Sequence, residues 1–226
     1  MRHGELDVTR HRSAIEAVLR EVNDPAGKDE YVLKGGTALS LLHGLDRFSE
    51  DIDLDALSCD IEHSHLEAAV EAVCEREGWT FRLSKDTQTT QRFFMNYGSP
   101  AMPLKIEASY RNARVREDLY EKREGICVYT LDALAGMKAS AYLARDKVRD
   151  LYDVAWLASE RLDDLAPSAC DALRRALEYK DLEQFDYLMR TQDDPLVDTA
   201  LLEERFLESF SRLGLLDDGP ELEMGR

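Results

Sequence analysis

Long hydrophobic runs are absent from this chain, and cysteine is scarce. No apolar stretch in the 226 residues approaches the roughly 20 that cross a bilayer, and the start, Met1–Glu5, resembles no secretion signal. Only four cysteines are present, and none forms a CxxC pair. These absences exclude a membrane protein and a secreted disulfide miniprotein, and they favour a cytoplasmic protein with reduced thiols.

Positive charge is also in short supply. The chain has 46 Asp and Glu against 29 Lys and Arg, a formal net charge of −17, so attraction of the whole molecule to nucleic acid or a membrane is not expected. The balance is uneven, because residues 105–149 hold ten bases and seven acids, whereas residues 158–226 hold eight bases and eighteen acids. We therefore expect the middle of the chain to meet any polyanionic ligand.

Apolar residues make up 44% of the sequence, enough for a sizeable core, and the length predicts one or two domains. Their spacing predicts an α/β (α+β) domain at residues 1–129, with a mixed sheet and flanking helices, followed by an all-helical domain at residues 130–226. Thr9 is expected to cap the first helix, residues 23–27 to end it, and residues 217–226 to fray. The expected helices cover residues 10–22, 37–42, 61–76, 131–143, 148–159, a stretch after Pro167 and 199–213. The expected strands cover residues 31–33, 51–56, 79–83, 92–97, 104–110 and 126–129.

The most informative segment is the glycine turn Lys34-Gly35-Gly36-Thr37, between an expected strand and an expected short helix. Two glycines at such a junction let backbone N–H groups approach a ligand closely. The helix that begins there adds the positive end of its dipole, which suits a phosphate, and Thr37 adds a hydroxyl. The alternative is that the glycines only make a turn, because short motifs often match by chance.

Two aspartates follow on the next expected strand. Asp51 and Asp53 lie two residues apart, so their carboxylates point to the same face, and carboxylate oxygens are ligands that Mg²⁺ prefers. Asp51 follows Thr37 by fourteen residues, and the combination of turn and acids is more specific than either motif alone. Neither a Walker A loop nor a Rossmann fingerprint is present.

A third carboxylate is expected at Glu107. The strand around it places Lys105, Glu107 and Ser109 on one face. Glu107 is also the only acid between Asp86 and Glu117. It is therefore a candidate third metal ligand, and the alternative is a surface acid paired with Lys105.

The helical part contains Lys138 and the charged run 145–153. Three aspartates of this run are expected to share one stripe of a helix: Asp146, Asp150 and Asp153. These acids either serve a site or pair with Lys147 and Arg149 on a solvent-exposed face, which is the more usual arrangement of such a run.

Taken in order, these motifs resemble the AbiEii/AbiGii nucleotidyltransferase toxins, the toxin halves of type IV toxin–antitoxin systems. The matching pattern is GGT-x-L, R-x-S-x-D-I-D-L, K-I-E, a lysine and R-D-x-Y-D, between residues 31 and 157. The resemblance implies a polymerase-β-like fold and transfer of a nucleoside monophosphate from an NTP to an acceptor, in several members the 3′ end of tRNA. It also implies two Mg²⁺ ions, a cognate antitoxin and no membrane partner.

The resemblance further implies a role for each matching residue. Asp51 and Asp53 hold the metal ions, and Glu107 either lowers the pKa of the acceptor hydroxyl or completes the second metal site. Lys138 neutralises the triphosphate, and Asp153 orients that lysine or the nucleotide. The expected nucleotide site consists of Lys34, Gly35, Gly36, Thr37 and Ser49. Arginines of the basic middle are expected to contact the phosphates of an RNA acceptor: Arg111, Arg114 and Arg116.

Two other functions fit the same residues. The first is transfer of the nucleoside monophosphate to a protein or a small molecule, which the acidic composition favours. The second is a catalytically silent binding protein, against which the intact Asp51 and Asp53 argue. Lys147 stays an alternative to Lys138 as the site lysine, and the sequence does not indicate which NTP is used.

Overall fold

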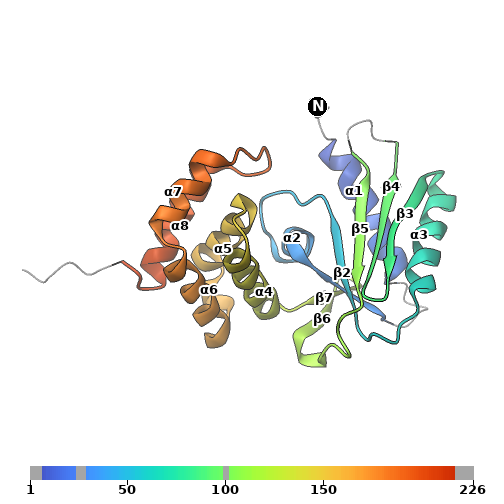
Figure 1. Cartoon of the computed structure of the whole chain (residues 1–226), viewed down its shortest axis with the longest axis horizontal. Helices are drawn as coiled ribbons and strands as arrows, with labels where there is room; N and C mark the ends of the chain where they lie inside the picture. The colour runs from blue at the N-terminus through green and yellow to red at the C-terminus, as the bar shows by residue number, and fades with distance from the viewer. Residues whose placement is uncertain (1–6, 24–28, 99–101, 217–226) are drawn as a thin grey trace, which may run out of the picture. The chain divides into compact units, whose positions relative to one another are not determined.

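The computed structural model describes residues 7–23, 29–98 and 102–216 of the chain. These residues form two compact units, Met1–Leu134 and Ala135–Arg226, which we describe separately (Figure 1). Most of the predicted helix stop at residues 23–27, and the whole of the predicted frayed tail at 217–226, lie outside the described residues.

The first unit contains a mixed sheet, as the sequence predicts, with seven strands where six were expected (Figure 1). The strand order is β3-β4-β5-β2-β1-β7-β6, in which β2–β5 and β1–β7 are parallel pairs and all other neighbours are antiparallel. The strands are β1 Tyr31–Lys34, β2 Ile52–Ala56, β3 Thr80–Thr87, β4 Thr90–Asn96, β5 Leu104–Ser109, β6 Tyr120–Arg123 and β7 Ile126–Tyr129.

Strand β6 was not predicted, because its sequence YEKR has no apolar alternation to reveal it. It pairs with β7 through a two-residue turn made by Glu124 and Gly125. Both residues have positive φ angles, 51° and 83°, as the tightest hairpin turns require. The turn, rather than apolar burial, therefore holds this edge strand in the sheet.

Two long helices, α1 Val8–Val22 and α3 His63–Glu77, pack against each other and against strands of the sheet (Figure 1). The N-cap of α1 is Asp7, whose carboxylate accepts a hydrogen bond from the Arg10 backbone N–H at 3.0 Å. The predicted cap at Thr9 is wrong, because the helix already begins at Val8, one residue after an equally good capping side chain.

The glycine turn leads into two short helical segments instead of the one predicted. The α-helical turn α2, Gly35–Ala38, continues as a π-helical turn over Leu39–His43 and ends at Gly44, whose φ is 86°. Wider π turns often occur at functional sites.

The apolar residues of β2 and β5 determine which face of the sheet carries acids. Ile52 and Leu54 on β2 are paired in register with Ile106 and Ala108 on β5, and all four are buried. Because side chains alternate along a strand, the acidic residues between them share the opposite face.

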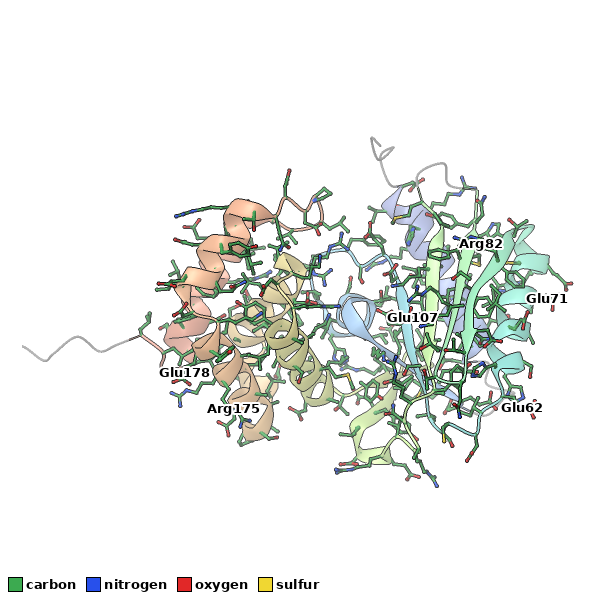
Figure 2. All side chains as sticks on the ribbon, viewed as in Figure 1. Glu62, Glu71, Arg82, Glu107, Arg175 and Glu178 are labelled. Atoms are coloured by element: carbon green, nitrogen blue, oxygen red, sulfur yellow. The ribbon has the colours of Figure 1, made fainter. Side chains whose placement is uncertain are left out.

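Surface charges such as Glu71 on α3 lie at the outside of this unit (Figure 2).

The second unit is helical, as predicted. Its helices are α4 Leu131–Ala144, which crosses the boundary between the units, α5 Val148–Glu160, α6 Pro167–Tyr179, α7 Leu182–Thr191 and α8 Thr199–Arg212. Helix α5 is the centre of the unit: it contacts α6, α7 and α8, and residues 150–159 are all buried. Thr130 caps α4 as predicted, because its hydroxyl accepts the Ala133 N–H at 3.3 Å. None of the helices described has the length and apolar content that a membrane-spanning segment needs.

Candidate active site

The glycine turn is built from close contacts with side chains of the adjacent segment. Gly35 has a φ of 78°, and a Cβ added to it would lie 3.1 Å from Oδ2 of Asp53. A Cβ on Gly36 would lie 2.8 Å from Oγ of Ser49 and 2.9 Å from the Arg47 guanidinium. Both positions therefore require glycine, the first for its backbone angle and for space, the second for space alone.

Thr37 connects this turn to the first aspartate. Its buried hydroxyl donates a hydrogen bond to the backbone carbonyl of Asp51 and lies 3.0 Å from Oγ of Ser49. In the structure this hydroxyl thus orients the start of β2. Its predicted contact with a triphosphate stays a prediction.

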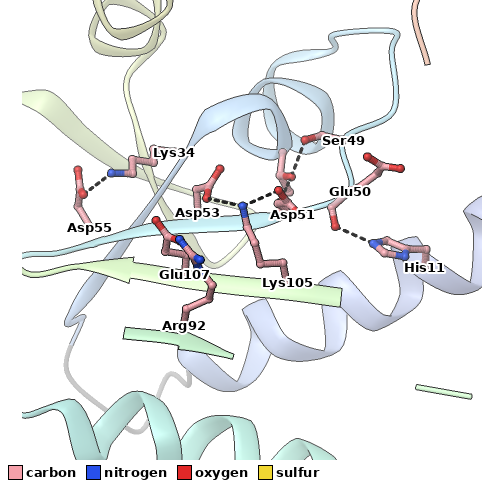
Figure 3. A network of polar contacts seen from close by, with 11 residues as sticks. His11, Lys34, Ser49, Glu50, Asp51, Asp53, Asp55, Arg92, Lys105 and Glu107 are labelled. Carbon is pink, nitrogen blue, oxygen red and sulfur yellow. Dashed lines mark hydrogen bonds and ion pairs between the residues drawn. The ribbon is translucent and has the colours of Figure 1, made fainter. Parts of the chain in front are cut away.

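Two of the acids expected at the site, Asp53 and Glu107, lie in one row across the sheet (Figure 3). Asp53 on β2 is aligned with Lys34 on β1 and with Glu107 on β5. Glu107 is in turn aligned with Arg92 on β4. Asp51 directly precedes β2 and is joined to the same row through a neighbouring lysine, described next.

Each of three cations on this face lies within ion-pair distance of at least one carboxylate (Figure 3). Nζ of Lys105 lies 2.7 Å from Oδ2 of Asp51 and 3.9 Å from Oδ1 of Asp53. The other two pairs, each at 2.5 Å, are Lys34 with Asp55 and Arg92 with Glu107. The alternative pairing of Glu107 with Lys105 is therefore wrong, because the β4–β5 register brings an arginine opposite the glutamate instead.

Burial and mutual charge perturb the titration of this cluster. Burial raises the pKa of Asp53 above its ordinary value; the Lys105 ammonium opposes that effect, and the Asp51 carboxylate adds to it. Burial alone would lower the pKa of Lys105, but its hydrogen bond to Asp51 and the charge of Asp53 outweigh burial, so this pKa is raised. Perturbed titratable groups of this kind concentrate at functional sites.

The aspartate pair fits a divalent metal ion. Asp51 and Asp53 offer hard carboxylate oxygens to a common point, and the Lys105 ammonium shows that a cation is stabilised there. Across the part of the chain that the structure describes, no group of three or more His, Cys, Asp or Glu converges closely enough to bind a metal ion. Glu107 is aligned with Asp53 but is paired with Arg92, so the three carboxylates do not form a ready-made metal site.

Sequence reasoning missed His11, which positions the residue before Asp51. This buried imidazole on α1 has Nε2 2.7 Å from the Glu50 carbonyl oxygen (Figure 3). Its Nδ1 lies 2.6 Å from the Tyr97 hydroxyl. Because a carbonyl only accepts, Nε2 carries the proton and donates. No local signal could have indicated this role, since the partners are 39 and 86 residues away in sequence.

The second unit contains the other two predicted catalytic residues. Nζ of Lys138 on α4 lies 2.6 Å from Oδ2 of Asp153 on α5, and their side chains are only 10% and 0% exposed. Lys147, the alternative site lysine, is exposed at the start of α5. The two lysines thus differ in their surroundings, and only Lys138 is buried beside a predicted site acid.

The charged run differs from the prediction that three of its aspartates share one stripe of a helix. Asp146 lies in the connection before α5 and pairs with Lys180 at 2.7 Å, so it does not continue the helix. Asp150 is buried and accepts two hydrogen bonds from Arg145, at 2.6 and 2.9 Å. The alternative of a solvent-exposed face paired through Lys147 is therefore wrong for Asp150.

The arginines predicted to bind the acceptor are exposed but already have acidic neighbours. Arg114 pairs with Glu117 at 3.4 Å, and Arg116 pairs with Asp118. These four residues line a shallow surface depression in the first unit. Arg111 is exposed as well. A polyanion that bound here would have to displace the acids.

Comparison with known proteins gives a match over most of the chain. The family described as "Nucleotidyl transferase AbiEii toxin, Type IV TA system" matches residues 17–222. The structure is similar to that of JHP933 from Helicobacter pylori, with a TM-score of 0.76, 27% identity, and coverage of 94% of this chain and 92% of that one. It is also similar to the nucleotidyltransferase toxin MenT4 from Mycobacterium tuberculosis, with a TM-score of 0.52, 19% identity, and coverage of 94% and 85%. The likeness to MenT4 concerns the fold alone. No protein with a curated description matches the chain.

Proposed function

This chain belongs to the AbiEii family of type IV toxin nucleotidyltransferases, and we propose that it moves a nucleoside monophosphate from an NTP to the 3′ end of a tRNA. The observation that carries the proposal is the aspartate pair, Asp51 and Asp53, directly beside a turn that only glycine can form. In the reaction the acceptor hydroxyl forms a bond to the α-phosphorus, and the bond to pyrophosphate breaks.

Asp51 and Asp53 are proposed to hold Mg²⁺, with two ions as the expected number. Glu107, which is aligned with Asp53 on the neighbouring strand, would contribute to the second ion once it parts from Arg92. Bound Mg²⁺ would act as a Lewis acid on the phosphoryl oxygens and as a template for in-line attack. The chemistry of the donors supports this assignment, because Mg²⁺ prefers carboxylate oxygens.

The triphosphate is proposed to bind at the glycine turn. The proposed contacts come from Lys34, Gly35, Gly36, Thr37 and Ser49. The start of α2 at this turn supports the placement, because the backbone N–H groups at a helix N-terminus suit a phosphate. In the second unit, Lys138 is proposed to neutralise charge on the triphosphate, and Asp153, at 2.6 Å, to orient its ammonium.

The reaction class is tested by incubating the protein with each α-labelled NTP, Mg²⁺ and total tRNA. Label should pass to RNA, and Asp51→Asn or Asp53→Asn should reduce transfer by at least about a hundredfold, as loss of a group essential to transition-state stabilisation does. Asp60→Asn, an exposed aspartate shortly after β2, is the matched control. Circular dichroism checks folding; full activity in a folded Asp51→Asn or Asp53→Asn variant would refute the metal assignment.

The acceptor is tested separately. Arg111, Arg114 and Arg116 are proposed to contact RNA phosphates, so the double variant Arg114→Glu with Arg116→Glu should weaken RNA binding and reduce its salt dependence, without changing the KM for the NTP. Unchanged RNA binding would remove these arginines from the site. Label on a protein or a small molecule instead of RNA would favour the alternative acceptor classes.

Family membership also implies an antitoxin partner. We propose that the protein acts in the cytoplasm, where NTP and tRNA are available. The state of the cysteines supports this placement, because all four are free thiols in the structure, as expected in a reducing compartment.

A further inference from the structure

Lys105 has contacts that the proposed reaction does not yet explain. Its ammonium lies between the two aspartates, 2.7 Å from an oxygen of Asp51 and 3.9 Å from an oxygen of Asp53. The other cations of the row are within ion-pair distance of different acids, Lys34 of Asp55 and Arg92 of Glu107. The point where a metal ion would bind is thus filled by a lysine of the same chain (Figure 3).

The position of Lys105 is set by the sheet. The parallel register aligns Ile106 with Ile52 and Glu107 with Asp53, which brings Lys105 level with Asp51. The buried Ile106 fixes the opposite face of β5, so the lysine side chain extends over the acidic face. Its side chain is 27% exposed, which leaves the ammonium room to move on its flexible stem.

Resting on the proposed metal-dependent reaction, we infer that Lys105 is the internal counter-cation of the aspartate pair. Without metal, its ammonium balances the charge of two neighbouring carboxylates. An incoming divalent cation competes with it, because an ammonium and Mg²⁺ between the same oxygens would repel each other strongly at this range. The displaced ammonium is then within reach of the phosphates of a bound NTP, where it contributes positive charge. Lys105 is therefore a charge-balancing residue of the metal site, additional to Lys138.

The competition is measured by titrating the full chain with Mn²⁺ alone and following free Mn²⁺ by electron paramagnetic resonance. Lys105→Met keeps much of the side-chain length and removes the charge, so it should bind Mn²⁺ at least about tenfold more tightly than the parent. Lys122→Met is the matched control: Lys122 on β6 also pairs with an aspartate, Asp29, at 2.8 Å, but lies three strands from β2 in the sheet order. This control should bind Mn²⁺ as the parent does.

A second measurement tests the movement toward the nucleotide. At saturating Mg²⁺, Lys105→Met should raise the KM for the NTP several-fold or more, because one phosphate contact is lost. Tighter Mn²⁺ binding together with weaker NTP binding is a combination that general loss of structure does not produce. If Lys105→Met does not fold, Lys105→Gln provides the same two readouts.

The outcomes separate this inference from the proposed function. If Mn²⁺ binding survives in the double variant Asp51→Asn with Asp53→Asn, the proposed metal site is wrong. If binding needs the aspartates but Lys105→Met binds Mn²⁺ no more tightly than the parent, only the competition is refuted. An unchanged KM for the NTP in Lys105→Met would refute the proposed contact between the displaced ammonium and the NTP phosphates.

Discussion

Replacing Lys138 with methionine is expected to destabilise the second unit, so the activity of this variant alone does not reveal whether the lysine is catalytic. The ammonium lies 2.6 Å from Asp153, a side chain with no exposed surface. Removing one partner of a buried ion pair typically costs about 3–5 kcal/mol. The variant Asp153→Asn should be destabilised by a similar amount, because it leaves the buried ammonium unpaired.

The double variant, Lys138→Met with Asp153→Asn, removes both charges at once. It should lie within about 1–2 kcal/mol of the parent, since neither buried charge then lacks its partner. The cycle should therefore give a coupling free energy of at least about 2 kcal/mol, well above the scatter of non-interacting sites. Lys147→Ala, at the exposed start of α5, should change stability by no more than about 0.5 kcal/mol.

The two tryptophans allow the second unit to be followed alone. Trp156 is buried on α5, one turn from Asp153, and Trp79 belongs to the first unit. In a Trp79→Phe background, fluorescence during urea unfolding therefore reports the free energy of unfolding around the ion pair. A loss below about 1 kcal/mol in Lys138→Met would refute the reasoning, because it would mean that the pair is effectively solvated.

Activity separates the two roles of the pair. If Lys138 acts on the triphosphate, the double variant recovers stability but transfers nucleotide orders of magnitude more slowly than the parent. If the double variant recovers both, the pair only holds α4 to α5, and the site lysine is another residue. A larger activity loss in Lys147→Ala than in the double variant would identify Lys147 instead.

Two further predictions concern the first unit. Gly35→Ala should lower the free energy of unfolding by about 1–3 kcal/mol and should also reduce the rate of nucleotide transfer, since its Cβ would approach Asp53 at 3.1 Å. Gly44→Ala, with a φ of 86° and open space around it, should lower stability without reducing transfer. Equal losses of activity in the two variants would contradict the argument. Burial raises the pKa of Tyr110 and of the Cys127 thiol each to about 12, so the folded state holds both protonated. Their preference for the protonated form stabilises the folded state fully at any pH below their unfolded pKa values. The free energy of unfolding then falls as pH rises above about 9–10, by up to about 1.4 kcal/mol per pH unit and group. A urea midpoint that stays constant from pH 8 to pH 11 would refute this linkage.

The parts of the fold that the sequence predicts well are those with strong apolar alternation. In β2, Ile52 and Leu54 alternate with acids, and the predicted bounds 51–56 differ from the observed Ile52–Ala56 by one residue. Helix α5 was predicted within one residue, because its apolar positions recur at helical spacing. Strand β6 carries no such pattern and was missed, since its pairing depends on the turn geometry of Glu124 and Gly125.

The polar partners within the site were harder to predict, because strand register and helix packing create them. Arg92 meets Glu107 only when β4 and β5 pair antiparallel in one particular register. His11 reaches the Glu50 carbonyl only when α1 packs near the start of β2. Neither relation is encoded by spacing along the chain, so a sequence indicates which acids could form a site but not which cations accompany them.

The charged run 145–153 is a second place where the partners of acidic residues could not be predicted from their spacing along the chain. A run so rich in charge normally indicates a solvated face, yet Asp150 and Asp153 are buried. Arg145, at the start of the run, supplies the counter-charge of Asp150, and Lys138 on α4 supplies that of Asp153. These pairs are not equivalent, since the side chain of Arg145 is 61% exposed whereas that of Lys138 is 10% exposed. A pair buried at both ends contributes little more to stability than apolar residues of similar volume would. Stability alone therefore explains Lys138 and Asp153 poorly, and the activity of the double variant is the measurement that distinguishes a structural pair from the proposed catalytic one.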